Sequence, residues 1–274
     1  MQLTPAIHLN NVDLSRKMAK GTYGKRYDAL KTRLRALQLA YKFAGQRGII
    51  VIEGWDAVGK GGLIQRLTAP LDPRGYQVWP IGAPTETESG EQYLQRFWRR
   101  LPRPGVFAIF DRSWYGRVLV ERAEGFAKPA VWRRAYDEIN AFEKMLTDDG
   151  VRIIKLFLHV SVEIQRERLA ARMADPLESW KLGASDLRNI VLRPDYEAAV
   201  NEMFERCSPQ ASPWFAVPFE NKHLGRIAAL ETIIERFGEG MDLAPPPLAR
   251  TLVVAARRIG LVTADKPSRR ATKK

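Results

Sequence analysis

The segment GIIVIEGWDAVGKGGLIQRL, residues 48–67, determines more of the fold than any other part of the sequence. It begins with a β-branched run without polar alternation, which indicates a strand buried on both faces, as in a parallel sheet. A glycine-rich loop follows at 54–62, and the apolar residues after it have helical spacing. A strand that leads through a glycine-rich turn into a helix is the setting of a phosphate-binding loop.

The loop also has the spacing of a phosphate-binding loop, because four residues separate Gly54 from Gly59 and Lys60 follows directly. Glycines allow backbone N–H groups to turn towards phosphate oxygens, and the start of the helix adds partial positive charge. A plain glycine-rich turn with a surface lysine is the alternative. We expect phosphate to be bound by Lys60 together with the loop residues Gly54, Ala57, Val58, Gly59, Gly61 and Gly62.

One loop position departs from the general pattern, because Gly61 stands where a Ser or Thr hydroxyl normally binds magnesium. Another group must then hold the metal. Asp56 lies inside the loop, where a carboxylate beside phosphate is costly unless a cation lies between them. We expect Asp56 to face Mg²⁺ or the acceptor phosphate; a solvated loop carboxylate is the alternative.

A second carboxylate, Asp111, ends the apolar run GVFAIFD. Nucleotide-handling enzymes hold magnesium at the carboxyl end of a parallel strand beside a phosphate loop. Arg112, Arg117 and Arg122 follow closely, and Glu121 lies one helical turn after Arg117, so these two can pair with each other and with a polyanion. Surface salt bridges are the alternative for each arginine. The crowding of charges favours a site for a polyanion.

Outside this region, strand-length hydrophobic runs alternate with stretches of helical period. The further strands are expected at 77–81, 106–110, 153–160 and 215–219. The expected helices lie at 61–69, 86–101, 116–123, 131–146, 162–173, 194–207 and 224–237. This alternation predicts right-handed βαβ units, so we expect an α/β protein with a doubly wound, parallel, five-stranded sheet covered on both faces.

Three parts are expected along the chain. Residues 1–46 form an N-terminal extension with an amphipathic helix at 22–45, whose apolar residues recur every three or four positions. Residues 47–240 form the core. The tail, 241–274, is rich in proline at APPPLAR, carries eight Lys and Arg against two Asp, and is expected to be an appendage.

Charge restricts the class of partner. The 274 residues carry 44 Lys and Arg against 31 Asp and Glu, a formal net charge of +13. This excess favours nucleic acid, an anionic membrane surface or a phosphate-rich substrate. No window approaches the roughly 18 apolar residues of a membrane span, no signal peptide is evident, and the single cysteine, Cys207, suits a reducing compartment. We therefore expect a cytoplasmic protein that has no membrane partner.

Four segments together resemble the family-2 polyphosphate kinases, which move phosphoryl groups between inorganic polyphosphate and nucleotides. They are GWDAVGKGG at 54–62, FDRSWYGRVLVER at 110–122, SWKLGASDLR at 179–188 and SPWFAVP at 212–218. The resemblance covers about residues 20–238. It implies a P-loop kinase sheet of the thymidylate-kinase type with a mobile, basic, helical lid.

The resemblance also implies roles for residues. Asp56 and Asp111 position magnesium and phosphates, and Lys60 binds the phosphate in transit. The catalytic set further includes Arg112, Arg117 and Glu121, and Arg122 lines the path of polyphosphate and nucleotide. The implied cofactor is Mg²⁺. The implied partners are polyphosphate, a nucleoside mono- or diphosphate and further copies of the chain in a dimer or tetramer, with no specific nucleic acid.

The lid is expected at about 174–192, where Asp175-Pro176 and Gly183 interrupt the helical period. Arg168, Arg172 and Lys181 are candidates to close over the transferring phosphoryl group, where cations neutralise developing charge, and Arg172 and Lys181 match the lid of the family. A basic, solvated helix face is the alternative. In APTETE, at 83–88, Thr85 and Glu88 have the spacing of a capping box. A nucleotide contact from Glu86 is the second interpretation.

These observations predict Mg²⁺-dependent phosphoryl transfer between polyphosphate and a nucleotide. Gly116 favours polyphosphate plus AMP giving ADP, because family members that act on diphosphates more often carry Asn at this position. Polyphosphate plus ADP or GDP giving the triphosphate, or the reverse reaction, is an alternative. An ATP-dependent nucleoside monophosphate kinase and a non-enzymatic binder of nucleic acid or anionic surfaces are further alternatives.

Overall fold

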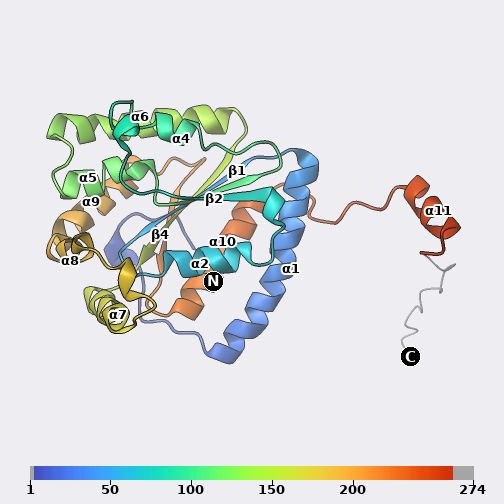
Figure 1. Ribbon diagram of the computed structural model, residues 1–274, viewed down its shortest axis with the longest axis horizontal. Helices are drawn as coiled ribbons and strands as arrows, with labels where there is room; N and C mark the ends of the chain where they lie inside the picture. The colour runs from blue at the N-terminus through green and yellow to red at the C-terminus, as the bar shows by residue number, and fades with distance from the viewer. Residues whose placement is uncertain (1–2, 262–274) are drawn as a thin grey trace. The chain divides into compact units, whose positions relative to one another are not determined.

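The computed structural model describes residues 3–261 (Figure 1). The chain divides into two compact units, residues 1–243 and 244–274. The sheet and the phosphate loop belong to the first unit. Within the described part of the second unit, helix α11, Arg250–Arg258, exposes the apolar side chains of Leu252 and Val254.

The first unit is built on one sheet of five parallel strands in the order β2-β3-β1-β4-β5. The strands are β1 (Gly48–Gly54), β2 (Tyr76–Pro80), β3 (Phe107–Asp111), β4 (Arg152–His159) and β5 (Trp214–Pro218). All five lie within a residue or two of their expected positions, and the doubly wound, P-loop-kinase type of sheet is confirmed. β1 is central, so the loop after it lies between two neighbouring strand ends.

Helices cover both faces of the sheet (Figure 1). One face carries α1 (Lys20–Ala44), α2 (Lys60–Thr68) and α10 (Lys222–Gly238), and the other carries α6 (Pro129–Asp148) and α9 (Arg193–Arg206). The expected long amphipathic helix is α1, whose Leu30, Leu34, Leu37 and Tyr41 are buried. α7 (Val162–Ala174) follows β4.

A lysine occupies the middle of a buried strand. Lys155 of β4 is fully buried, and its ammonium donates to Glu143 Oε2 at 2.6 Å, to the Tyr115 hydroxyl at 2.8 Å and to the carbonyl of Cys207 at 2.8 Å. Glu143 Oε1 in turn accepts from Tyr115 and from the indole of Trp114. The network ties α6 and β4 to the short 3₁₀-helix η3, Trp114–Arg117, that follows β3.

Two expected helices are interrupted. The stretch 86–101 forms two single turns, α3 (Glu86–Ser89) and α4 (Gln95–Trp98), because Gly90 ends the first and the Gln92 side chain accepts the backbone N–H of Leu94. The capping box of Thr85 and Glu88 is present. The stretch 116–123 is likewise divided into η3 and α5 (Val120–Ala123).

The region after α7 is where the lid is expected, and its function as a lid stays a prediction. It contains the 3₁₀-helix η4 (Ser179–Lys181) and then α8 (Ala184–Val191), which leads directly into α9. We call α8 the lid helix. At the N-terminus, η1 (Leu9–Asn11) lies against α9, because Leu9 N donates to Asn201. None of the helices in residues 3–261 is long and apolar enough to cross a membrane.

Candidate active site

The phosphate loop connects the end of β1 to the start of α2. Gly54 and Gly59 have φ values of 142° and 114°, and Ala57 has 58°, so the loop turns through conformations that favour glycine. A Cβ on Gly54 would lie 2.6 Å from the carbonyl oxygen of Leu158 in β4. Glycine is therefore required at this position both by the backbone and by the neighbouring strand.

Lys60 lies at the first position of α2 with its side chain folded over the loop. Its ammonium donates to the carbonyls of Gly54, at 2.8 Å, and Trp55, at 3.1 Å. Burial lowers the pKa of Lys60, and Asp56 opposes that shift. Gly61 has open space around its Cβ position. The loop therefore places one cation at the mouth of a helix N-terminus, where phosphate binds well.

Asp56 is held from two sides. Arg112 Nη2 donates to its Oδ1 at 3.0 Å, and Asn189 Nδ2 donates to its Oδ2 at 2.6 Å. Burial would raise the pKa of Asp56, but Lys60, the Asn189 hydrogen bond and Arg112 outweigh burial, and the pKa lies below its usual value. Asp56 is therefore an ionised carboxylate of fixed orientation.

Asp111 ends β3 in register with Ile52 of β1. Its backbone is held, because its carbonyl accepts from Ile81 N and the next residue, Arg112, donates its N–H to Ile52. Arg112 has a φ of 66°, so the chain turns sharply after the strand. The Asp111 carboxylate itself makes no hydrogen bond or ion pair with residues 3–261.

These two carboxylates suit Mg²⁺ that is shared with a substrate. In the part of the chain that the structure describes, no group of three or more His, Cys, Asp or Glu could hold a metal. Mg²⁺ keeps several waters and commonly binds through one or two carboxylates plus substrate phosphates. Asp111 has both oxygens available, and Asp56 has remaining lone pairs, so the donor set fits Mg²⁺ bound together with phosphate.

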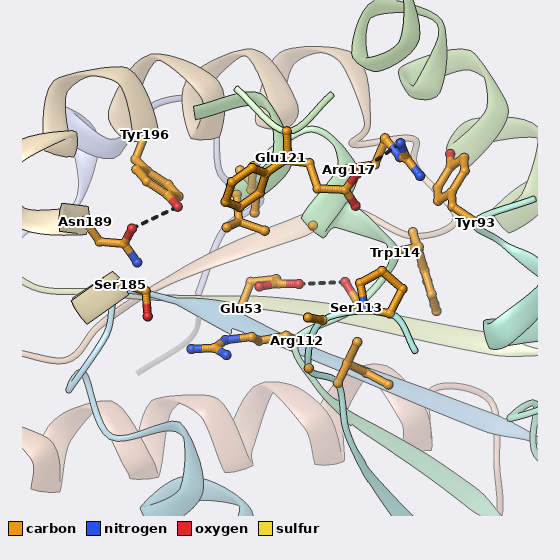
Figure 2. A pocket seen from close by; sticks show the side chains of 18 of the residues that line it. Glu53, Tyr93, Arg112, Ser113, Trp114, Arg117, Glu121, Ser185, Asn189 and Tyr196 are labelled. Carbon is orange, nitrogen blue, oxygen red and sulfur yellow. Dashed lines mark hydrogen bonds and ion pairs between the residues drawn. The ribbon is translucent and has the colours of Figure 1, made fainter. Parts of the chain in front are cut away.

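A cavity of about 670 Å³ opens beside the first half of the loop (Figure 2). Of the expected site residues, its lining includes Gly54, Asp56, Arg112, Arg117 and Glu121. The guanidinium of Arg117 pairs with Glu121 at 3.0 Å and lies 4.5 Å from the ring centre of Tyr93. Charged and aromatic side chains therefore share one cavity, as expected for a site that takes a phosphorylated ring compound.

Glu53 also lines the cavity. It is the only charged residue of β1, is 6% exposed, and accepts a hydrogen bond from Ser113 Oγ at 2.7 Å (Figure 2). Burial raises the pKa of Glu53. The sequence analysis did not select Glu53, although a carboxylate at the end of a fully apolar strand is a signal that could have found it.

The other expected residues lie outside the cavity lining. Arg122 pairs with Glu202 at 2.6 Å and also donates to the Tyr136 hydroxyl, so it joins α5 to α6 and α9. Glu86 is exposed in the first turn of α3. Lys181 pairs with Glu178 on η4. Their substrate contacts stay predictions.

The second half of the phosphate loop, residues 58–62, lies next to cationic side chains rather than next to the cavity. Arg168 donates to the carbonyl of Val58 at 2.8 Å, Lys222 Cε lies 4.0 Å from the Cβ position of Gly59, and Arg226 Nη2 lies 3.1 Å from that of Gly62. Burial lowers the pKa of Lys222, and four surrounding guanidinium groups lower it further. We call the five residues the basic cluster: Arg66, Arg168, Arg172, Lys222 and Arg226.

Of the basic cluster, Arg172 was selected from the sequence as a site residue, and Arg168 was a candidate with a solvated helix face as an equal alternative. Lys222 and Arg226 lie in the first turns of α10, far from any recognised motif, and a lone surface cation is uninformative in sequence. Only the fold brings α2, α7 and α10 to the same loop. Cations gathered around backbone amides at the start of a helix form a binding surface for several phosphates.

The central strand, the phosphate loop that follows it and the strand order of the sheet define a fold of the P-loop kinase type. A comparison with models of protein families identifies the family within this fold. Residues 17–241 match the model of polyphosphate kinase 2, and the chain belongs to this family.

Relatives with different acceptors are similar to this chain. It is 43% identical over 227 residues to the polyphosphate:AMP phosphotransferase of Pseudomonas syringae pv. tomato. That match covers 83% of this chain and 46% of the relative. It is 37% identical over 221 residues to the GDP-polyphosphate phosphotransferase of Mycolicibacterium smegmatis. That match covers 81% of this chain and 78% of the relative. The chain spans about half the length of the polyphosphate:AMP phosphotransferases it matches.

Solved structures agree with this assignment. The crystal structure of polyphosphate kinase 2 from Arthrobacter aurescens TC1 superimposes with a TM-score of 0.86 at 30% sequence identity. The match covers 94% of this chain and 95% of that chain. The sheet and its surrounding helices are therefore those of the family.

Proposed function

We propose that this protein transfers a phosphoryl group from inorganic polyphosphate to a nucleotide in the presence of Mg²⁺, with AMP as the preferred acceptor and ADP as the product. One observation carries the proposal: the two halves of the phosphate loop face different surroundings. Gly54, Trp55 and Asp56 line the cavity, whereas Val58, Gly59 and Gly62 lie against the basic cluster.

The basic cluster suits the donor. Polyphosphate presents a row of negative charges and no base, so a surface of several cations binds it through charge and hydrogen bonds alone. Arg168 is already tied to the carbonyls of Val58, Phe219 and Glu220, which makes it a support for the loop as well as a source of charge. Lys222, Arg226 and Arg172 remain to contact the donor.

The cavity suits the acceptor. A nucleotide whose phosphate lies near Asp56 and Arg112 has room for its base among the aromatic and apolar side chains of Tyr93, Phe126 and Val120. Lys60 would neutralise charge on the group in transfer, and Asp56 and Asp111 would hold Mg²⁺, which would supply further positive charge there. Catalysis by positioning and charge neutralisation is sufficient for phosphoryl transfer, because a loose transition state needs little covalent chemistry from the protein.

The preference for AMP rests on Gly116. This residue lies in the cavity lining beside Arg117, and a Cβ there would meet only Val120 Cγ1, at 3.6 Å. A Cβ therefore fits at this position without a clash, and an asparagine would place an amide beside Arg117, where it could orient a second acceptor phosphate. Glycine lacks that contact. The relatives at 43% identity are polyphosphate:AMP phosphotransferases, and several near 37% act on GDP.

The assay that tests the proposal combines purified protein with polyphosphate, Mg²⁺ and each of AMP, ADP, GMP and GDP, with products followed by chromatography. We expect AMP to be consumed fastest and ADP to accumulate before ATP. Faster conversion of ADP to ATP under equal conditions contradicts the acceptor assignment and leaves phosphoryl transfer from polyphosphate intact. Transfer from ATP but not from polyphosphate contradicts the donor assignment and favours a nucleoside monophosphate kinase.

The variant Gly116→Asn tests the acceptor argument on its own. We expect it to raise kcat/KM for ADP relative to AMP, because it adds an amide where the second phosphate would lie. Val120→Ala is the matched control, since it changes the same pocket without adding a polar group. If the ratio of kcat/KM for ADP to kcat/KM for AMP is unchanged in Gly116→Asn, the proposed role of this position is wrong.

Cytoplasmic location and assembly into a dimer or tetramer stay predictions.

A further inference from the structure

Asn189 connects the lid helix to the phosphate loop. It lies 133 residues after Asp56 in the chain, yet its Nδ2 lies 2.6 Å from Asp56 Oδ2. Asp56 Oδ1 is bound by Arg112. The lid helix thus supplies one of the two groups that fix the orientation of this carboxylate.

The orientation of the Asn189 amide is itself determined by a neighbour. The hydroxyl of Tyr196, on α9, donates to Asn189 Oδ1 at 3.1 Å (Figure 2). Tyr196 is 9% exposed and lines the same cavity. Because Oδ1 is occupied as an acceptor, Nδ2 is the amide atom that faces Asp56 as a donor.

We propose that Asn189 is a positioning residue for the reaction: its amide, oriented by Tyr196, holds Asp56 in the direction needed for Mg²⁺ and phosphate when the lid helix is docked. The proposal rests on the proposed function of Asp56 as a metal-binding carboxylate. Asp56 Oδ2 has two lone pairs, so the hydrogen bond from Asn189 and a metal can be accommodated together.

Hydrogen bonds behind a metal-binding carboxylate fix its direction and basicity, and removing them weakens metal binding or activity. Here that bond comes from the element expected to move during turnover. A lid helix that leaves the loop takes the Asn189 amide with it, and among residues 3–261 the Asp56 carboxylate then keeps only the exposed side chain of Arg112 as a hydrogen-bond partner. Lid docking and readiness of the metal site are therefore coupled through one hydrogen bond.

The lid helix has a second attachment that makes the test selective. Arg188 pairs with Glu124 at 3.1 Å, so α8 remains tied to the core when the Asn189 amide is removed. Asn189→Leu keeps the size of the side chain and removes both hydrogen bonds. Tyr196→Phe removes only the hydroxyl that orients the amide. Val191→Ala, at a position 78% exposed on the same helix, is the matched control.

Two measurements are made on the full chain. The first is the dependence of the initial rate on Mg²⁺ concentration with polyphosphate and AMP saturating. The second is amide hydrogen exchange of residues 54–60 without metal or substrate. We expect Asn189→Leu to raise the Mg²⁺ concentration for half-maximal rate by about 10- to 100-fold and to speed exchange in the loop. Tyr196→Phe should act in the same direction to a smaller extent.

The variant Asp56→Asn distinguishes a failure of the proposed metal role of Asp56 from a failure of the inference about Asn189. If Asp56→Asn leaves the Mg²⁺ dependence unchanged, the metal role in the proposed function is wrong. If Asp56→Asn shifts it and Asn189→Leu does not, the inference about Asn189 alone is overturned. A fall in Tm for Asn189→Leu without a change in Mg²⁺ dependence or loop exchange also overturns it, because that result describes packing only.

Discussion

Lys60 and Asp111 carry opposite charges next to the same loop, and each is expected to act on charge rather than on folding. We predict that Lys60→Ala and Asp111→Asn each lower kcat by about 10²- to 10³-fold, as loss of a group that stabilises transition-state charge does elsewhere. Steady-state rates with polyphosphate and AMP measure the effect. Lys25→Ala, at an exposed position of α1, is the control for loss of a lysine.

Thermal unfolding of these variants should match that of wild type. Rates within a few-fold of wild type for either variant would contradict the assignment.

Lys60, Asp56 and Asp111 were all recognisable from the sequence, because strand ends and a glycine-rich loop surround them. Asn189 was not, because its importance arises from a contact with Asp56, 133 positions away, whereas Glu53 had a sequence signal in its position at the end of an apolar strand.

His159 gives the protein a pH dependence of stability. Its Nδ1 accepts from the Trp55 indole at 2.9 Å, and burial, with the charge of Arg193, lowers its pKa to about 4. The unfolded chain binds a proton near pH 6.5, so it holds more protons than the folded chain between pH 6.5 and 4, and stability falls as the pH falls through this range. We predict a loss of about 2 kcal/mol between pH 7 and pH 5.

Urea unfolding at the two pH values measures this loss. His159→Gln keeps an acceptor for Trp55 and removes the titrating group, so its curve isolates the contribution of His159. The difference between wild type and His159→Gln should be larger at pH 7 than at pH 5. An equal difference at both values would show that His159 does not titrate in this range.

At the scale of elements, the buried ion pair of Lys155 and Glu143 joins β4 and α6 to η3. Removing one member leaves the other charged and without its partner. We predict that Lys155→Met lowers the free energy of unfolding by about 3–5 kcal/mol. Combining it with Glu143→Gln should recover part of that loss, because no charge is then buried. Urea denaturation of both variants measures the change, and a loss below about 1 kcal/mol for Lys155→Met contradicts the prediction.

Sequence periodicity predicted the strands and long helices well and the short elements poorly. β1 and β4 are apolar runs bounded by turns, and their burial on both faces leaves a clear signal. The stretches 86–101 and 116–123 also have helical spacing, yet they break into single turns. Local competition from Gly90 and Gln92 decides the first case, and the anchoring of η3 by Glu143 contributes to the second.

At the scale of the whole molecule, the compact unit ends at Leu243, whereas composition placed the start of the tail at 241. Met241 and Leu243 pack against the hydrophobic core. We predict that a chain of residues 1–243 keeps nearly the full kcat. A chain of residues 1–240 should lose about 1 kcal/mol of stability, or roughly 2–4 °C in Tm. Loss of most activity in the chain of residues 1–243 would show that the tail takes part in the reaction.

Residues 262–274, which hold much of the basic charge expected in the tail, lie outside the described residues.

The burial of Cys207 has a practical consequence. This residue is the single cysteine of the chain, is fully buried at the end of α9, and has the pKa of its thiol raised by burial to about 12. A protonated, inaccessible thiol does not react with maleimides at neutral pH. The chain is therefore ready for single-site labelling: Val191→Cys would place one reactive thiol on the lid helix while the native Cys207 stays in place, and an attached fluorophore would report whether that helix moves during turnover.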